Sequence, residues 1–183
     1  ESLMKKVIFS DIDGVLNCTQ SYIKNNEDRL FYGRHSLESM ELYVKSHMAH
    51  IDYERLELLK QIALRTGASV IFTSAWIGLR IWPLIEEEFI RRGLPVGKPI
   101  QIVAGRGRAI KDYVESEEVD KFVILDDDIF ADYDEDLLPF LIKLKFHDGG
   151  LMEEHVKEAI DYLGDISDMR YLSLNHLDKP RTF

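Results

Sequence analysis

Short apolar runs alternate along this chain with longer segments in which apolar residues recur every three or four positions. The apolar runs are rich in Val, Ile, Leu and Phe, so we expect buried strands at 7–10, 68–72, 100–104, 122–125 and 138–146. Helical spacing predicts helices over 36–48, 53–66, 81–92, 106–119 and 151–163. This alternation predicts an α/β fold, a doubly wound and mainly parallel sheet with helices on both faces.

Polar residues follow three of the expected strands. The strands lead into Asp11-Ile12-Asp13-Gly14, Thr73-Ser74 and Asp126-Asp127-Asp128. In a doubly wound sheet, ligands bind beyond the carboxyl ends of the strands, so we expect these three segments to converge. Each has a simpler interpretation as a solvated turn or a helix cap. Three such strand ends together favour a functional site.

The Asp11–Asp13 pair is the most informative of these segments. Like charges at such short range repel, and a divalent cation, a shared proton or a phosphorylated substrate would relieve the repulsion. If the extended geometry continued past the strand, both side chains would lie on the same side. A calcium loop of the EF-hand type is a poor alternative, because its sixth and twelfth positions would be Leu16 and Tyr22 instead of glycine and glutamate.

Length and composition place the chain among ordinary globular proteins. With 183 residues we expect one domain, 1–183, that contains a small cap-like or lid-like insertion at 17–51. This polar insertion directly follows the candidate loop, where either a lid or a purely structural excursion would fit. No run is long enough to span a membrane, and the single cysteine, Cys18, favours a reducing compartment, so we expect a cytoplasmic protein. The net charge of −10 disfavours broad capture of nucleic acid.

The three polar segments resemble the motifs of the haloacid dehalogenase-like (HAD) superfamily of phosphohydrolases. Asp11 to Val15 is similar to its first motif, Thr73 or Ser74 to its second, and Asp126-Asp127 to its acidic fourth. The chain more closely resembles the small branch of this superfamily found in multifunctional RNA-repair proteins. The segments that carry this closer resemblance are 51–59, 73–76, 123–128 and 150–155.

The third motif of that superfamily is a lysine or arginine placed before the strand of the fourth motif. Arg106 is our first choice, and Lys98, Arg108 and Lys111 are the alternatives. The branch usually carries an arginine after the tryptophan of the second motif, where this chain has Ile77. A phosphate contact from that position is therefore not expected here.

The resemblance implies a role for each candidate residue. Asp11 would attack phosphorus, and Asp13 would protonate the leaving oxygen and later activate water. Asp11, the backbone carbonyl of Asp13 and Asp127 would hold Mg²⁺, with Asp126 acting directly or through water. The side chains that would contact the phosphate oxygens are those of Thr73, Ser74 and Arg106.

Three functions follow from this assignment. The first is a Mg²⁺-dependent phosphatase acting on a small phosphate ester or a nucleotide. The second is a polynucleotide end phosphatase in nucleic-acid repair, and the third is a catalytically silent binding module of the same fold. The sequence does not indicate an oligomeric state.

Other residues with reactive or aromatic side chains are weaker candidates for a functional site. His47 and His50 have the spacing of metal ligands on a helix, but without a nearby third ligand a solvated pair is favoured. A buried thiol is favoured over a nucleophile for Cys18. For Trp76 and Trp82, stacking on a nucleobase competes with packing in the core.

Overall fold

A four-stranded parallel sheet lies at the centre of the protein. The structure is a computed structural model, which describes residues 3–147 and 149–167. The strand order is β2-β1-β3-β4. The strands are β1 (Lys6–Ser10), β2 (Ser69–Phe72), β3 (Lys121–Asp126) and β4 (Leu141–Lys143). The central strand β1 pairs with β2 on one side and β3 on the other, and Phe9 is in register with Ile71 and Ile124.

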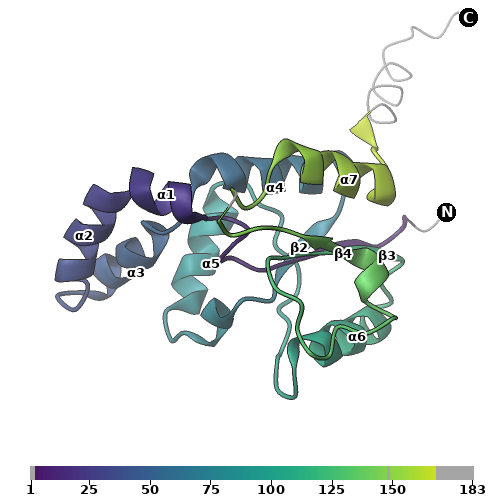
Figure 1. The fold of residues 1–183 in the computed structure, drawn as a ribbon. Coiled ribbons are helices and arrows are strands. Elements are labelled where there is room, and N and C mark those ends of the chain that lie inside the picture. Colours follow the sequence, from purple (N-terminus) through teal and green to yellow (C-terminus); the bar gives the residue numbers. More distant parts are fainter. Residues whose placement is uncertain (1–2, 148, 168–183) are drawn as a thin grey trace, which may run out of the picture.

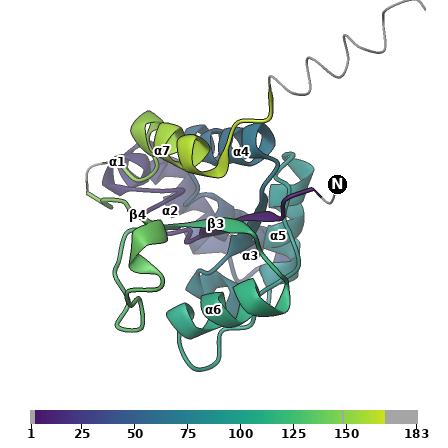
Figure 2. The ribbon, with the colours of Figure 1, turned by 90° about the vertical axis from the view of Figure 1, so that its right-hand side faces the viewer.

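Helices cover both faces of this sheet. Helices α4 (Tyr53–Thr66) and α7 (Glu153–Leu163) lie side by side on one face, and α6 (Arg106–Ser116) lies on the other (Figures 1 and 2). Alternate residues of β1 enter two separate cores, Ile8 on the α4–α7 side and Phe9 on the α6 side. Helix α5 (Trp82–Arg91) packs against Phe72 of β2 through the rings of Trp82 and Phe89. The predicted fold class is confirmed.

Local sequence signals explain where α4 begins and ends. The carboxylate of Asp52 accepts a hydrogen bond from the backbone N–H of Glu54 and so caps the first turn. Gly67 ends the helix in the left-handed conformation, with a φ of 74°.

Four of the predicted elements differ from the structure. The predicted strand at 100–104 is wrong: only Val96 forms an isolated bridge with Val70, and 100–104 is a loop in which Ile100 packs into the core while Val103 is 92% exposed. Of the predicted strand at 138–146, only β4 forms, because a short 3₁₀ helix that contains Pro139, η2 (Leu138–Phe140), precedes it. Helix α6 ends at Ser116, three residues before the predicted end, and the backbone of Glu118 then adopts a φ of 51°.

The fourth difference concerns the segment 17–51, which holds three helices where one was predicted. They are α1 (Thr19–Lys24), α2 (Asn26–His35) and α3 (Met40–Met48). The three helices extend away from the sheet (Figure 1), and α2 has no buried residue. Helix α3 begins later than the predicted residue 36, because the side chain of Ser39 caps it by accepting from the N–H of Leu42.

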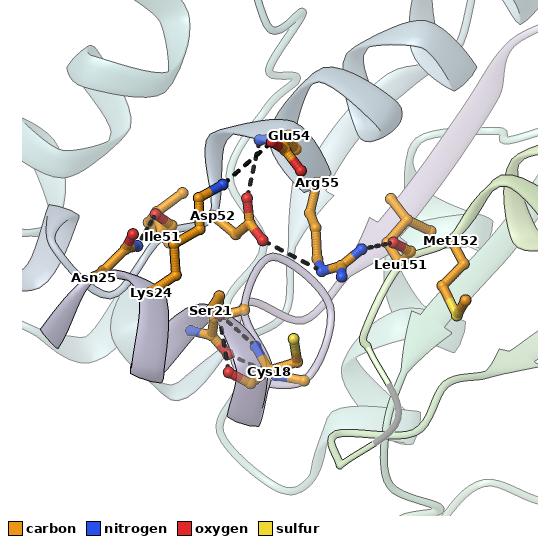
Figure 3. A network of polar contacts seen from close by, with 12 residues as sticks. Cys18, Ser21, Lys24, Asn25, Ile51, Asp52, Glu54, Arg55, Leu151 and Met152 are labelled. Carbon is orange, nitrogen blue, oxygen red and sulfur yellow. Dashed lines mark hydrogen bonds and ion pairs between the residues drawn. The ribbon is translucent and has the colours of Figure 1, made fainter.

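Polar contacts fix the base of this insertion to the rest of the fold (Figure 3). The side-chain amide of Asn25 donates to the carbonyl oxygen of Ile51 at 3.2 Å. Asp52 forms an ion pair with Arg55 at 3.6 Å, and Arg55 donates to the carbonyl oxygen of Leu151 at 2.6 Å. Lys24 of α1 also forms an ion pair with Glu54 at 3.1 Å, so the insertion is tied to the first turn of α4, which Arg55 in turn links to the segment that precedes α7.

Among the described residues, no helix combines the length and apolarity that crossing a bilayer needs.

Candidate active site

The three polar strand ends lie next to one another because their strands are neighbours in the sheet. The backbone N–H of Asp11, after β1, donates to the carbonyl oxygen of Leu125 in β3 at 2.9 Å. The N–H of Thr73, after β2, donates to the carbonyl oxygen of Ser10 at 2.9 Å. These bonds extend the parallel ladder by one residue on each side, so the sheet itself aligns the three segments.

Three carboxylates meet at this edge of the sheet. Asp11, Asp126 and Asp127 each offer a carboxylate oxygen, and these atoms all lie within 4.8 Å of one another. Gly14 makes room for Asp127: a Cβ atom at Gly14 would lie 2.2 Å from Cγ of Asp127, and the φ of Gly14 is 85°. A set of oxygen donors at this spacing fits a hard divalent cation such as Mg²⁺.

Asp126 is the most enclosed member of this group and is fully buried. Its Oδ2 atom accepts from the guanidinium of Arg106 at 2.8 Å and from the hydroxyl of Tyr133 at 3.0 Å. Its Oδ1 atom accepts from the backbone N–H of Asp128 at 3.0 Å. Because these donors already engage both oxygens, Asp11 and Asp127 are the better placed ligands for a cation, and Asp126 holds Arg106 in place.

Of the four candidate basic residues, Arg106 alone contacts these acids in the described part of the chain. As the first residue of α6, it places Nη1 3.1 Å from Oδ2 of Asp11, and its guanidinium lies over the ring of Phe130 at 4.1 Å. The alternatives form ion pairs elsewhere: Lys98 with Glu117 at 2.5 Å, Arg108 with Asp112 at 3.0 Å, and Lys111 with Asp134.

Burial and mutual repulsion change the protonation of this group. Burial raises the pKa of Asp11 to about 7; the charge of Arg106 opposes this shift, and the Asp126 carboxylate adds to it. Burial and the adjacent Asp126 also raise the pKa of Asp127. Burial disfavours the charged form of Arg106, but Asp11 and Asp126 outweigh this effect and raise its pKa. A positive charge in addition to that of Arg106 would therefore stabilise the charged forms of Asp11 and Asp127.

The two hydroxyl residues after β2 have different surroundings. Both side chains are buried. The hydroxyl of Ser74 accepts from the N–H of Trp76 at 3.2 Å and so caps the 3₁₀ helix η1 (Ala75–Gly78), and a phosphate contact from its own O–H stays a prediction. Within the part of the chain that the structure describes, the hydroxyl of Thr73 has no hydrogen-bond partner. Leaving a buried hydroxyl without a partner is costly, and a ligand oxygen would satisfy it.

Asp13 lies apart from the three-acid cluster. Strand β1 ends at Ser10 and the chain bends at Ile12, so the extended geometry that would place Asp11 and Asp13 on one side does not continue past the strand. The carboxylate of Asp13 instead accepts from the indole N–H of Trp76 at 3.1 Å and the amide of Asn17 at 2.9 Å. Cation binding through the backbone carbonyl of Asp13 stays a prediction.

A cleft of about 650 Å³ adjoins these groups. The residues with polar side chains that line it are Thr73, Ser74, Gln101 and Arg106. Apolar residues, among them Ile77 and Phe130, line much of the remainder. Ile77, at the position where the RNA-repair branch usually carries an arginine, thus contributes an apolar surface, and Arg106 is the cation among the residues that line the cleft.

Three residues of the site were missed by the sequence analysis. Asn17 closes the first loop by accepting from the N–H of Gly14 at 2.9 Å, and its spacing from Asp13 was the available signal. Tyr133 and Phe130 contact Asp126 and Arg106 from the loop after β3, and no local pattern marks either residue.

The remaining candidate residues pack against other side chains of the protein. His47 and His50 are half-buried against the rings of Trp76 and Tyr22, so they are not the solvated pair that was favoured. In the described residues, the three aspartates are the group that could hold a metal ion, and neither histidine is part of it. Cys18 is buried and Trp82 packs in the core, as favoured.

Comparison with known proteins identifies the family of the chain. A family model described as "HAD domain in Swiss Army Knife RNA repair proteins" matches residues 7–156, which include all three polar strand ends and Arg106. No curated protein and no solved structure matches the chain. Because the family model covers most of the sequence, the chain belongs to the family of HAD domains found in Swiss Army Knife RNA repair proteins.

Proposed function

We propose that this protein is a Mg²⁺-dependent phosphohydrolase that cleaves a phosphomonoester through an aspartyl-phosphate intermediate on Asp11. The observation that carries the proposal is the meeting of three carboxylates with Arg106, next to a cleft also lined by Thr73, whose hydroxyl has no hydrogen-bond partner among the described residues. Clustered acids suit a divalent cation, and a guanidinium and a free hydroxyl that line one cleft suit the oxygens of a phosphate group. Membership of the HAD family supports the same chemistry.

Each residue of the site has its own role in the proposed reaction. The carboxylate of Asp11 forms a bond to phosphorus while the bond to the leaving oxygen breaks, and that oxygen takes the proton of Asp13. Arg106 and Thr73 hold the equatorial phosphate oxygens and offset the charge that develops on them. Asp13 then removes a proton from the water that attacks the phosphorylated Asp11. Asp11 and Asp127 would hold Mg²⁺, which supplies positive charge against the repulsion between carboxylates and phosphate.

We assign the insertion 17–51 the role of a cover beside the substrate entrance. The hydroxyl of Tyr22 in α1 lies 3.5 Å from Oδ1 of Asp13, so the insertion contacts the proposed acid directly. A second open cavity, of about 510 Å³, lies between α1, the start of α2 and Phe146. Residues of the insertion are therefore well placed to select the leaving group.

Removal of a terminal phosphate from RNA is the second candidate function, because the matching family is described from RNA repair proteins. Polynucleotide binding requires several cationic contacts to the backbone. Among the described residues that line the main cleft only Arg106 is cationic, and the net charge of the chain is −10. A substrate with a single phosphate group is therefore favoured over a long polyanion.

The test is phosphate release from 4-nitrophenyl phosphate, mononucleotides and end-phosphorylated oligonucleotides, with and without Mg²⁺. Asp11→Asn removes the nucleophile and should abolish turnover while circular dichroism stays unchanged. Asp128→Asn is the matched control, since Asp128 is an exposed acid of the same run and lies outside the three-acid cluster. Turnover that survives in Asp11→Asn would refute the assigned nucleophile. A steep loss of activity with salt on oligonucleotides, absent for mononucleotides, would favour the RNA function.

A further inference from the structure

The carboxylate of Asp13 is held from several directions. The indole N–H of Trp76 donates to Oδ2 at 3.1 Å. The amide of Asn17 donates to Oδ1 at 2.9 Å, and the hydroxyl of Tyr22 lies 3.5 Å from the same atom. Asp13 itself lies in a turn and is exposed, so its own backbone and burial do little to fix the direction of its side chain.

Trp76 is itself rigidly placed. Its backbone N–H donates to the hydroxyl of Ser74, which caps η1, and its side chain is buried. The imidazole of His47 meets the indole ring edge to face, with centroids 5.3 Å apart at an interplanar angle of 87°. Nδ1 of His47 in turn donates to the carbonyl oxygen of Tyr43 at 3.1 Å, so helix α3 of the insertion supports the indole. An indole N–H can only donate a hydrogen bond, and here it donates to Asp13.

We propose that Trp76 is a positioning residue that aims the carboxyl group of Asp13 at the leaving oxygen of the substrate. This inference rests on the proposed phosphatase function. During the first step, the electron pair of the breaking P–O bond stays on the leaving oxygen, which takes the proton of Asp13, while an oxygen of Asp11 forms the new P–O bond. Proton transfer requires hydrogen-bond distance between Asp13 and that oxygen, so a freely rotating carboxyl group slows the step.

The role of Trp76 has a kinetic signature that depends on the leaving group. An alkoxide is a poor leaving group and needs the proton, whereas 4-nitrophenolate leaves readily without one. Loss of positioning at Asp13 therefore slows alkyl phosphates far more than 4-nitrophenyl phosphate. A general structural defect at the active site would slow both substrates by similar factors.

The experiment measures kcat/KM for glycerol phosphate and for 4-nitrophenyl phosphate in the wild-type protein, Trp76→Phe and Trp82→Phe. We expect Trp76→Phe to lower kcat/KM about tenfold or more for the alkyl ester and about threefold or less for the aryl ester. Trp82→Phe is the matched control, because Trp82 is equally buried but packs against Phe72 and Phe89. Equal losses on both esters, or none, would overturn the inference. A wild-type protein that releases phosphate from neither ester, nor from the mononucleotides and end-phosphorylated oligonucleotides named above, refutes the phosphatase itself.

A spectroscopic measurement tests the contact without relying on activity. The chain has two tryptophans, so ¹⁵N-labelled protein gives two indole N–H signals, which Trp82→Phe assigns. We expect Asp13→Ala to shift the Trp76 signal and to leave that of Trp82 in place. If Trp76→Phe fails to fold, a benzothienylalanine at position 76 retains the ring shape and lacks the donor. A Trp76 signal that is unaffected by Asp13→Ala contradicts the proposed contact.

Discussion

Gly14→Ala tests the placement of Asp127 over the first loop. The Cβ atom that this substitution adds would lie 2.2 Å from Cγ and 2.3 Å from Oδ2 of Asp127. Non-bonded carbon atoms normally approach to about 3.5 Å, so the carboxylate has to move by roughly 1 Å or more. Alanine must also adopt the φ of 85° that glycine has here. The substitution therefore perturbs both the backbone and the proposed metal ligand.

The expected size of the effect follows from these two changes. A left-handed conformation costs a residue other than glycine about 1–2 kcal/mol. For a protein of this size the loss lowers the melting temperature by about 2–8 °C in the absence of metal. Mg²⁺ demands ligand distances near 2.0–2.1 Å, so we expect the displaced carboxylate to weaken Mg²⁺ binding by about tenfold or more.

Thermal unfolding and calorimetric titration with Mg²⁺ measure the two effects separately. Gly33→Ala is the matched control: Gly33 lies in α2, and an added Cβ atom would meet nothing within 4 Å. Alanine in a helix is more stable than glycine by about 0.5–1 kcal/mol, so this control should melt slightly higher and bind Mg²⁺ as the wild type does. A Gly14→Ala protein with unchanged stability and affinity would show that Asp127 does not lie over the loop.

Three further predictions concern the acids and their partners. Arg106→Met leaves the fully buried Asp126 without its counter-charge, and urea unfolding should show a loss of about 3–5 kcal/mol; a loss below about 1 kcal/mol contradicts the ion pair. Tyr133→Phe removes one donor to the same carboxylate and should cost about 1.5–3 kcal/mol in the same assay, whereas wild-type stability would exclude that hydrogen bond. Because burial raises the pKa of Asp11 to about 7, the metal-free protein should lose stability as pH rises from about 4 to 7. The affinity for Mg²⁺ should rise about tenfold per pH unit over the upper part of this range, because the metal binds the deprotonated carboxylate. An affinity that does not change with pH contradicts the raised pKa of Asp11.

The sheet and the meeting of the three strand ends were predictable because both follow from local patterns. Buried parallel strands read as short apolar runs, and β1, β2 and β3 all lie where such runs occur. A parallel sheet then places the ends of those strands at one edge, which carries Asp11, Thr73 and Asp126 together. The prediction needed no knowledge of side-chain direction.

The sequence made Arg106 the first choice but could not exclude its three alternatives, and it did not predict the direction of the Asp13 side chain, because both depend on distant contacts. Lys98, Arg108 and Lys111 are equally basic, and what separates them from Arg106 is that each forms an ion pair with another acid. The carboxylate of Asp13 is oriented by Trp76, which is 63 residues away in the chain. Tertiary structure determines both outcomes.

The wrong strand at 100–104 and the unforeseen helices of the insertion have a different cause. The apolar residues of 100–104 lie in different surroundings: Ile100 packs on the α6 side of the sheet, whereas Val103 is exposed at the cleft. Helix α2 buries nothing, so its sequence lacks the apolar stripe that marks most helices. Apolarity alone does not separate a strand from the wall of a cleft, and a helix without a buried face gives no periodic signal.

The most direct test of the central claim is to trap the phosphorylated enzyme. During turnover of 4-nitrophenyl phosphate with Mg²⁺, borohydride reduces an aspartyl-phosphate to homoserine, and peptide mass spectrometry locates the altered residue. Phosphoryl transfer to Asp11 predicts homoserine at position 11, dependent on substrate and absent in Asp11→Asn. Turnover with an unmodified Asp11, or homoserine at another aspartate, would contradict it.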